Sequence, residues 1–200
     1  MLKNALKKFL NCETTSNIVV KRVEFHDNNA SDLCVIKGHS VVQDIRKCIS
    51  LLESQYGLFT PDQKEASELA LAACSRFIYK DVLDTKASEI FEHNGWSLQP
   101  DGTVPLGVFI SGPRRLGKTH MFSFIMAAVL FSVPGVVVLG LAAEPRPAEL
   151  LYEAVVEKVK TLISLTKRGK VGRQSVEHFY LEINDKVSKM HVLSARMGNG

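Results

Sequence analysis

Eight consecutive residues have the types and the spacing of a loop that binds phosphate. They follow the pattern G-x-x-x-x-G-K-[ST] and are Gly112, Pro113, Arg114, Arg115, Leu116, Gly117, Lys118 and Thr119. The glycines let backbone amides turn inward around phosphate groups, and a helix that begins at the lysine directs its positive end toward them. The sequence therefore predicts a binding site for the phosphates of a nucleoside triphosphate.

Four side chains of this loop are candidates for the chemistry. We expect Lys118 to reach the β and γ phosphates and the Thr119 hydroxyl to bind Mg²⁺, which bridges the same phosphates. Arg114 or Arg115 could stabilise the charge that develops on the γ phosphate. Alternatively, both arginines could be solvated or paired with nearby carboxylates. The predicted ligands are ATP and Mg²⁺.

A helix start upstream of the loop supplies one more candidate. Thr60 is placed as an N-cap, Pro61 at the first helical position, and Gln63 three residues after the cap, where it completes a capping box. We expect this helix to run toward Phe77. Gln63 could recognise adenine, or its capping role could be its whole function.

The segments around the loop alternate between strand and helix patterns. Val104–Ser111 is an apolar run that predicts the strand before the loop, and residues 84–103 read as a polar connection. After the loop we expect a buried helix at 118–131, a strand at 136–142, a helix at 147–160 and a hairpin of strands at 177–183 and 187–194. This order predicts an α/β fold with a mainly parallel sheet and helices on both faces.

Composition and charge limit the possible classes of protein. The chain has 200 residues, of which 46% are hydrophobic and 23% charged, and a net charge of +4, so it can bury a core and tolerates anionic partners. The spacing of the four cysteines does not match that of zinc ligands; they are Cys12, Cys34, Cys48 and Cys74. We therefore expect reduced thiols in an intracellular protein. The uncharged run 121–143 is divided by Pro134 and Gly135, so we expect no membrane span. The basic segment 167–173 could contact a nucleic-acid backbone or be a solvated loop.

The N-terminal residues and the acidic residues give weaker signals. The sequence predicts a short amphipathic helix at residues 1–10 and at most a strand at residues 18–25. It indicates no function for residues 1–57. A carboxylate is expected to hold the hydrated Mg²⁺, but neither Glu144 nor the stretch 180–185 is a convincing candidate. The sequence also lacks the Asn-Lys-x-Asp motif of GTPases. We therefore expect the sheet to be completed beyond Gly200.

The loop and the segments after it resemble the ATPase region of the terminase large subunit of herpesviruses and related tailed viruses. The resemblance covers about residues 104–200, and a weaker similarity is found at residues 58–63. The double-arginine loop is the most specific element of the resemblance. Residues 190–200 resemble the stretch that precedes the family's Walker B strand. Gly112 and His120 depart from the family's pattern, which suggests a distant branch.

The resemblance implies a fold, an activity and partners. It implies an α/β P-loop NTPase of the ASCE type, incomplete at the C-terminus, with residues 1–57 as a region of unknown role and 58–200 as the first part of the ATPase domain. The implied activity is ATP hydrolysis that drives viral double-stranded DNA into a capsid. The implied partners are other terminase subunits, the portal and further copies in a ring, in the host nucleus. Two alternatives stay open: a P-loop helicase or AAA+ ATPase, and an interaction module that binds nucleotide without hydrolysing it.

Overall fold

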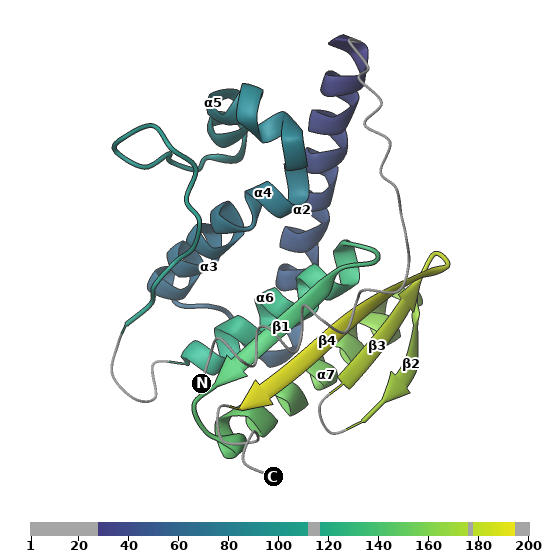
Figure 1. Cartoon of the computed structure of the whole chain (residues 1–200). Helices are drawn as coiled ribbons and strands as arrows, with labels where there is room; N and C mark the ends of the chain where they lie inside the picture. The colour runs from purple at the N-terminus through teal and green to yellow at the C-terminus, as the bar shows by residue number, and fades with distance from the viewer. Residues whose placement is uncertain (1–27, 112–116, 176–177, 195–200) are drawn as a thin grey trace.

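The computed structural model describes residues 28–111, 117–175 and 178–194, and these residues form a mixed α/β fold (Figure 1). The helix expected at 1–10, the strand expected at 18–25 and loop residues 112–116 lie outside the described residues. The elements are α2 (Asn28–Tyr56), α3 (Pro61–Ala73), α4 (Ser75–Tyr79), η2 (Lys80–Val82), α5 (Leu83–Asn94), α6 (Lys118–Ser132), β1 (Val137–Ala142), α7 (Pro145–Thr166), β2 (Lys170–Gln174), β3 (His178–Ile183) and β4 (Lys186–Ser194).

The four strands form one sheet in the order β1-β4-β3-β2. β1 pairs with β4 in parallel, whereas β3 pairs antiparallel with both β4 and β2. The expectation of a mainly parallel sheet therefore holds only for β1 and β4. The hairpin causes the difference: Asn184 and Asp185 have φ values of 50° and 60°, the left-handed conformation of a two-residue turn that sends the chain straight back.

The described helices that pack on the sheet lie on one of its faces. α6 and α7 both contact β1 and β4, and Figure 1 shows both helices behind the strands. The side chains that alternate into this face include Phe179, Leu181 and Met190, which are fully buried. α2 contacts α6 and α7 and forms a further layer. Helices on both faces of the sheet are thus not seen among the described residues.

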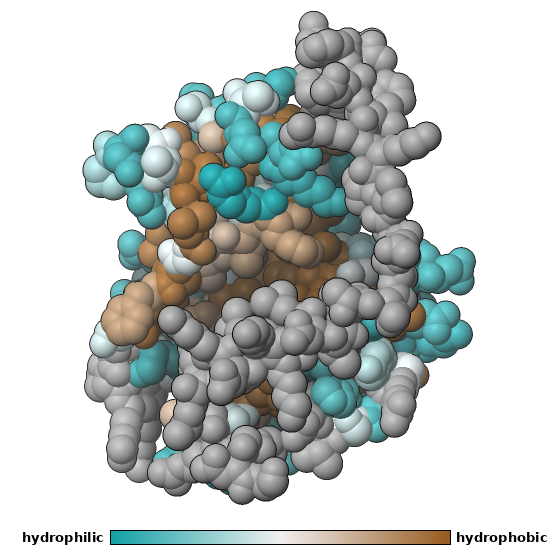
Figure 2. Space-filling view, viewed as in Figure 1, coloured by the Kyte–Doolittle hydropathy of each residue, from teal (hydrophilic) through white to brown (hydrophobic). Residues whose placement is uncertain are grey.

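The segment expected to be the strand before the loop is not a strand. Residues 104–111 have no regular secondary structure, and the side chains of Leu106 and Phe109 are 82% and 92% exposed. A β-strand needs a neighbour for its backbone hydrogen bonds, and in Figure 1 this segment runs to the loop apart from the sheet. Apolar surface also gathers in the hollow between α4 and α5 and the strands (Figure 2).

Other local predictions are confirmed. Thr60 caps α3, Pro61 is its first residue, and the capping box with Gln63 is formed, although α3 ends at Ala73 and not near Phe77. The uncharged run 121–143 is divided between α6 and β1. Within the part of the chain that the structure describes, no helix is both long enough and apolar enough to cross a membrane.

Two helices were not predicted. α2 buries Val35, Val42, Ile45, Ile49 and Leu52, which recur at helical spacing and could have revealed it. α5 lies in the stretch that reads as a polar connection. It nevertheless buries Leu83, Ile90 and Phe91, which recur at helical spacing. It ends at Asn94, before Gly95, whose φ of 70° suits the left-handed C-cap of a helix.

A polar cluster joins α2, α4 and α5. The Tyr79 hydroxyl lies 2.8 Å from Nδ1 of His39 and accepts a hydrogen bond of 2.9 Å from the Asn94 side chain. The rings of His39 and His93 stack with their centroids 3.7 Å apart. Burial lowers the pKa of His39, the neighbouring His93 lowers it further, and Glu89 acts in the opposite direction. The net shift favours the neutral form of His39.

We expect this cluster to make the fold sensitive to acid. The pKa of His39 is lower in the folded protein than its value of about 6.5 in the unfolded chain, so the unfolded state binds more protons below that pH. The contribution of neutral His39 to the free energy of unfolding is present above about pH 6.5. It is lost as the pH falls through the pKa that His39 has in the folded protein. Urea unfolding at pH 7.5 and pH 5 should show a lower midpoint at pH 5. His39→Gln should reduce this difference, and an unchanged difference in that variant would contradict the assignment.

Candidate nucleotide-binding site

The described part of the phosphate loop is its junction with α6. Gly117 precedes α6 as its N-cap with φ 74° and ψ 18°, a left-handed conformation that glycine adopts without strain. Because the N-cap residue is a glycine, it contributes no side-chain oxygen to the amide groups of the first turn of this helix. Lys118 is half-buried and Thr119 is exposed at this helix start. This arrangement suits a bound phosphate group, because the amides and the helix dipole favour an anion.

α6, which begins at this junction, is packed on several sides by other elements. The helix is apolar all round and buries residues on every side, among them Met121, Phe124, Ile125 and Leu130. It packs against α2, α3 and α7 as well as the sheet. In Figure 1 α6 begins at the end of the sheet where β1 and β4 finish. Ligands of open α/β sheets bind at this end of parallel strands.

Five other residues of the predicted phosphate loop precede this junction. Gly112, Pro113, Arg114, Arg115 and Leu116 lie outside the described residues. Their contacts with phosphate therefore stay predictions, as does the choice between Arg114 and Arg115 at the γ phosphate.

Gln63 lies beside the last glycine of the loop, although 53 residues and several helices separate the two along the chain. Its Nε2 atom is 2.6 Å from the point that a Cβ atom on Gly117 would occupy. The same side chain accepts the Thr60 N–H in the capping box. The structure thus brings together two site residues that the sequence could only name separately.

His120 is a packing residue. Its ring lies 4.5 Å from the ring of Phe124 and 6.5 Å from that of Phe59, measured between centroids. Burial is the main cause that lowers the pKa of His120, and Lys158 lowers it further. Both observations describe an imidazole ring that packs against aromatic side chains.

Sequence reasoning missed a buried charge behind the site. The Lys158 side chain on α7 is 6% exposed, its Nζ lies 2.9 Å from Glu157 Oε2, and it stands 4.0 Å from the centroid of the Tyr56 ring. The hydrogen bond from Lys158 is the main cause that lowers the pKa of Glu157. Lys158 occupies a position within the apolar stripe of α7, next to Val155 and Val159, and that position was the available signal.

The acidic candidates lie at opposite ends of the sheet. Glu144 is exposed and follows β1, so it is at the same end as the start of α6. Glu182 and Asp185 precede β4 or lie in the turn before it, at the other end, and Glu182 pairs with Lys170 at 3.1 Å. Glu182 and Asp185 therefore cannot hold a magnesium ion on Thr119.

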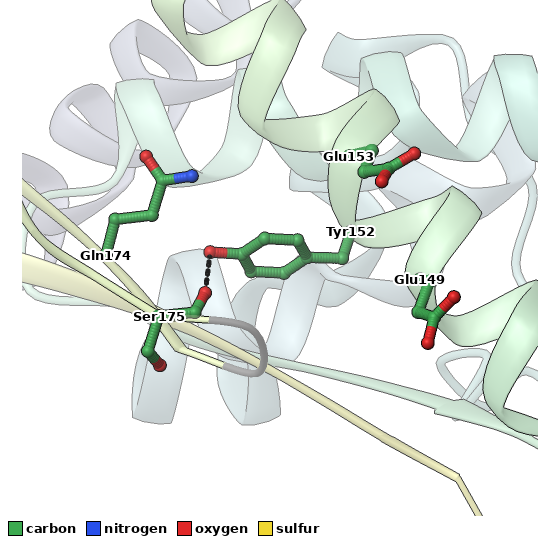
Figure 3. A pocket seen from close by; sticks show the side chains of 5 residues that line it. All are labelled: Glu149, Tyr152, Glu153, Gln174 and Ser175. Carbon is green, nitrogen blue, oxygen red and sulfur yellow. Dashed lines mark hydrogen bonds between the residues drawn. The ribbon is translucent and has the colours of Figure 1, made fainter.

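The described residues also line a pocket that is less suited to phosphate. This pocket has a volume of about 510 Å³ and is lined by Glu149, Tyr152, Glu153, Gln174 and Ser175. Figure 3 shows the Tyr152 hydroxyl donating a hydrogen bond to the Ser175 carbonyl, with both carboxylates directed away from that bond. Two glutamates in the lining would repel a nucleoside triphosphate.

The fold and the loop junction define a mixed α/β protein with a candidate nucleotide-binding site at the start of α6. No protein-family model matches the chain, and no curated protein matches it. Among solved structures, the chain is similar in part to a mutant ATPase domain of the large terminase of a Thermus phage. The TM-score is 0.38 and the identity 23%, and the match covers 41% of this chain and 38% of that chain.

Proposed function

We propose that this chain is part of the ATPase motor subunit of a viral DNA-packaging terminase of the herpesvirus type. The observation that carries the proposal is the double-arginine phosphate loop, which leads into α6 through the left-handed Gly117. On this proposal the chain acts in a ring of copies at the capsid portal, in the host nucleus, and moves double-stranded DNA. Its fold belongs to the ASCE class of P-loop NTPases, with the ATPase domain starting near residue 58.

The chemistry proposed for the site is hydrolysis of ATP. Water attacks the γ phosphorus, the bond to the bridging oxygen breaks, and ADP and inorganic phosphate leave. Lys118 binds the β and γ phosphates, the exposed Thr119 hydroxyl is suited to hold Mg²⁺, and Arg114 or Arg115 stabilises the γ phosphate. Mg²⁺ would supply charge neutralisation between the phosphates.

A carboxylate is also needed to hold the hydrated Mg²⁺. Glu182 and Asp185 lie at the wrong end of the sheet, whereas Glu144 stands at the N-cap of α7, directly after β1. We expect the 200 residues alone to hydrolyse ATP weakly or not at all, because Lys118 and Thr119 do not assemble the Mg²⁺ site by themselves.

The proposal is tested by the reaction of the full protein on double-stranded DNA. We expect DNA to stimulate ATP hydrolysis, and a bound third strand to be displaced from a triplex as the motor advances, while the duplex itself stays paired. Lys118→Ala should abolish both signals. Separation of the duplex strands would favour the helicase alternative instead. Tight ATP binding without turnover in the full protein would favour the non-hydrolysing module.

A further inference from the structure

We propose that Gln63 is a positioning residue that supports the phosphate loop at Gly117, and that its effect on nucleotide affinity does not depend on the base. This inference rests on the proposed ATP site and assigns Gln63 a different task from reading adenine.

The capping box fixes which way the Gln63 carboxamide faces. Its Oε1 accepts the backbone N–H of Thr60 at 2.9 Å, and the Gln63 N–H donates to Thr60 Oγ1 at 3.3 Å. An oxygen must face the Thr60 N–H, because an NH₂ group there would put two donors together. The donor atom Nε2 consequently points away from the cap.

Nε2 occupies the space beside Gly117. It lies 2.6 Å from the ideal Cβ position of that glycine, and Cδ lies 3.9 Å from the same point. A side chain at 117 would therefore collide with the carboxamide. Gly117 is the residue whose φ of 74° turns the chain from the loop into α6. The carboxamide is placed to limit the movement of that turn.

The element that presents Gln63 is itself tied to α6. The Phe59 N–H donates to Glu53 Oε1 at 2.8 Å, which holds the chain between α2 and α3. The Phe59 ring packs on Phe124 of α6 with centroids 5.0 Å apart. Since both ends of the contact rest on packed elements, Gln63 and Gly117 keep a fixed relative position.

The same geometry argues against adenine recognition. A glutamine that reads adenine uses both amide atoms, with Oε1 accepting from N6 and Nε2 donating to N7. Here Oε1 faces Thr60 and Nε2 faces Gly117, so the two atoms already serve the helix cap and the loop. Reading the base would require Gln63 to leave the capping box.

The test compares three ligands and three variants by titration calorimetry, with Mg²⁺ present throughout. The ligands are ATP, GTP and inorganic tripolyphosphate. Gln63→Glu keeps the acceptor and remains a good third residue of a capping box, but it replaces the donor near Gly117 with a carboxylate oxygen. Gln63→Ala removes both atoms. Thr60→Ala is the matched control, because it weakens the cap and leaves the Gln63 carboxamide in the chain.

We expect Gln63→Glu and Gln63→Ala to weaken binding of all three ligands by a similar factor of about tenfold, and Thr60→Ala to change it less than twofold. Circular dichroism should show that Gln63→Glu retains its helices. A loss confined to ATP would overturn the proposal in favour of adenine recognition, and an equal loss in Thr60→Ala would reduce Gln63 to a helix cap. Unchanged binding in both Gln63 variants would overturn this inference and leave the ATP site standing. Failure of the unmodified chain to bind any of the three ligands would overturn the ATP site itself.

Discussion

Lys118→Ala is expected to weaken the binding of Mg-ATP by about 10- to 100-fold, the range for loss of a hydrogen bond to a charged group. Lys118 is the first residue of α6, directly after the glycine N-cap, so it stands at the positive end of the helix dipole. The ammonium contributes a full charge to the β and γ phosphates, which the helix dipole alone does not replace. Titration calorimetry of the 200-residue chain measures the change directly, since binding does not require turnover.

Lys160→Ala is the control for this substitution. Lys160 is an exposed lysine on α7, so the variant loses the same formal charge at a site away from the loop. Its affinity for Mg-ATP should stay within about twofold of the unmodified chain, because exposed charges are screened by salt. If both variants lost affinity equally, the effect would come from net charge, and the assignment of Lys118 would be wrong.

Phe124→Ala is expected to reduce the free energy of unfolding by about 3 to 5 kcal/mol. Phe124 is fully buried on α6, and its ring centroid lies 6.0 Å from that of Tyr56 and 5.0 Å from that of Phe59. It therefore fills the space where the end of α2, the start of α3 and α6 meet. Truncation leaves a cavity that these three helices cannot close by small shifts. Urea denaturation followed by circular dichroism gives the change.

Phe77→Ala is the matched control for that prediction. The Phe77 side chain is 50% exposed on α4, so its removal leaves no closed cavity and should cost about 1 kcal/mol or less. Comparable losses in the two variants would contradict the packing described for α6. Because Phe59 also positions Gln63, Phe124→Ala should weaken tripolyphosphate binding as well, while Phe77→Ala should not.

The elements whose burial follows a simple pattern could be predicted from sequence. α6 is apolar throughout, β1 is rich in valine, and α7 and the β3–β4 hairpin alternate with their expected periods. The helix start at Thr60 was predictable to the residue, because capping is a local interaction between Thr60 and Gln63. Local chemistry was sufficient in each of these cases.

The arrangement of the sheet was not predictable in the same way. An apolar run such as 104–111 has the composition of a strand, but only a neighbouring strand makes it one, and the described segment has none. The antiparallel hairpin of β3 and β4 was predicted, but the addition of β2 beside β3 was not, because the sequence indicated only a basic segment at 167–173. α5 was missed because polar residues separate its apolar ones, although Leu83, Ile90 and Phe91 recur at helical spacing.

The candidate site also contains features that could be predicted from sequence and features that could not. The spacing from Gly112 to Thr119 predicted phosphate binding because that chemistry is contained in eight adjacent residues. The approach of Gln63 to Gly117 and the burial of Lys158 over Tyr56 depend on helices far apart in sequence. No periodicity in a single segment carries that information.

We propose that the triphosphate of ATP binds at the start of α6. A titration of the ¹⁵N-labelled chain with Mg-ATP, followed by NMR, tests it amide by amide. We predict that the amide signals of Gly117, Lys118 and Thr119 shift most among the described residues and that Lys118→Ala removes the shifts. Shifts that gather instead at Tyr152 and Ser175, in the pocket beside α7, would contradict the account, as would no change at Gly117 to Thr119 under saturating Mg-ATP.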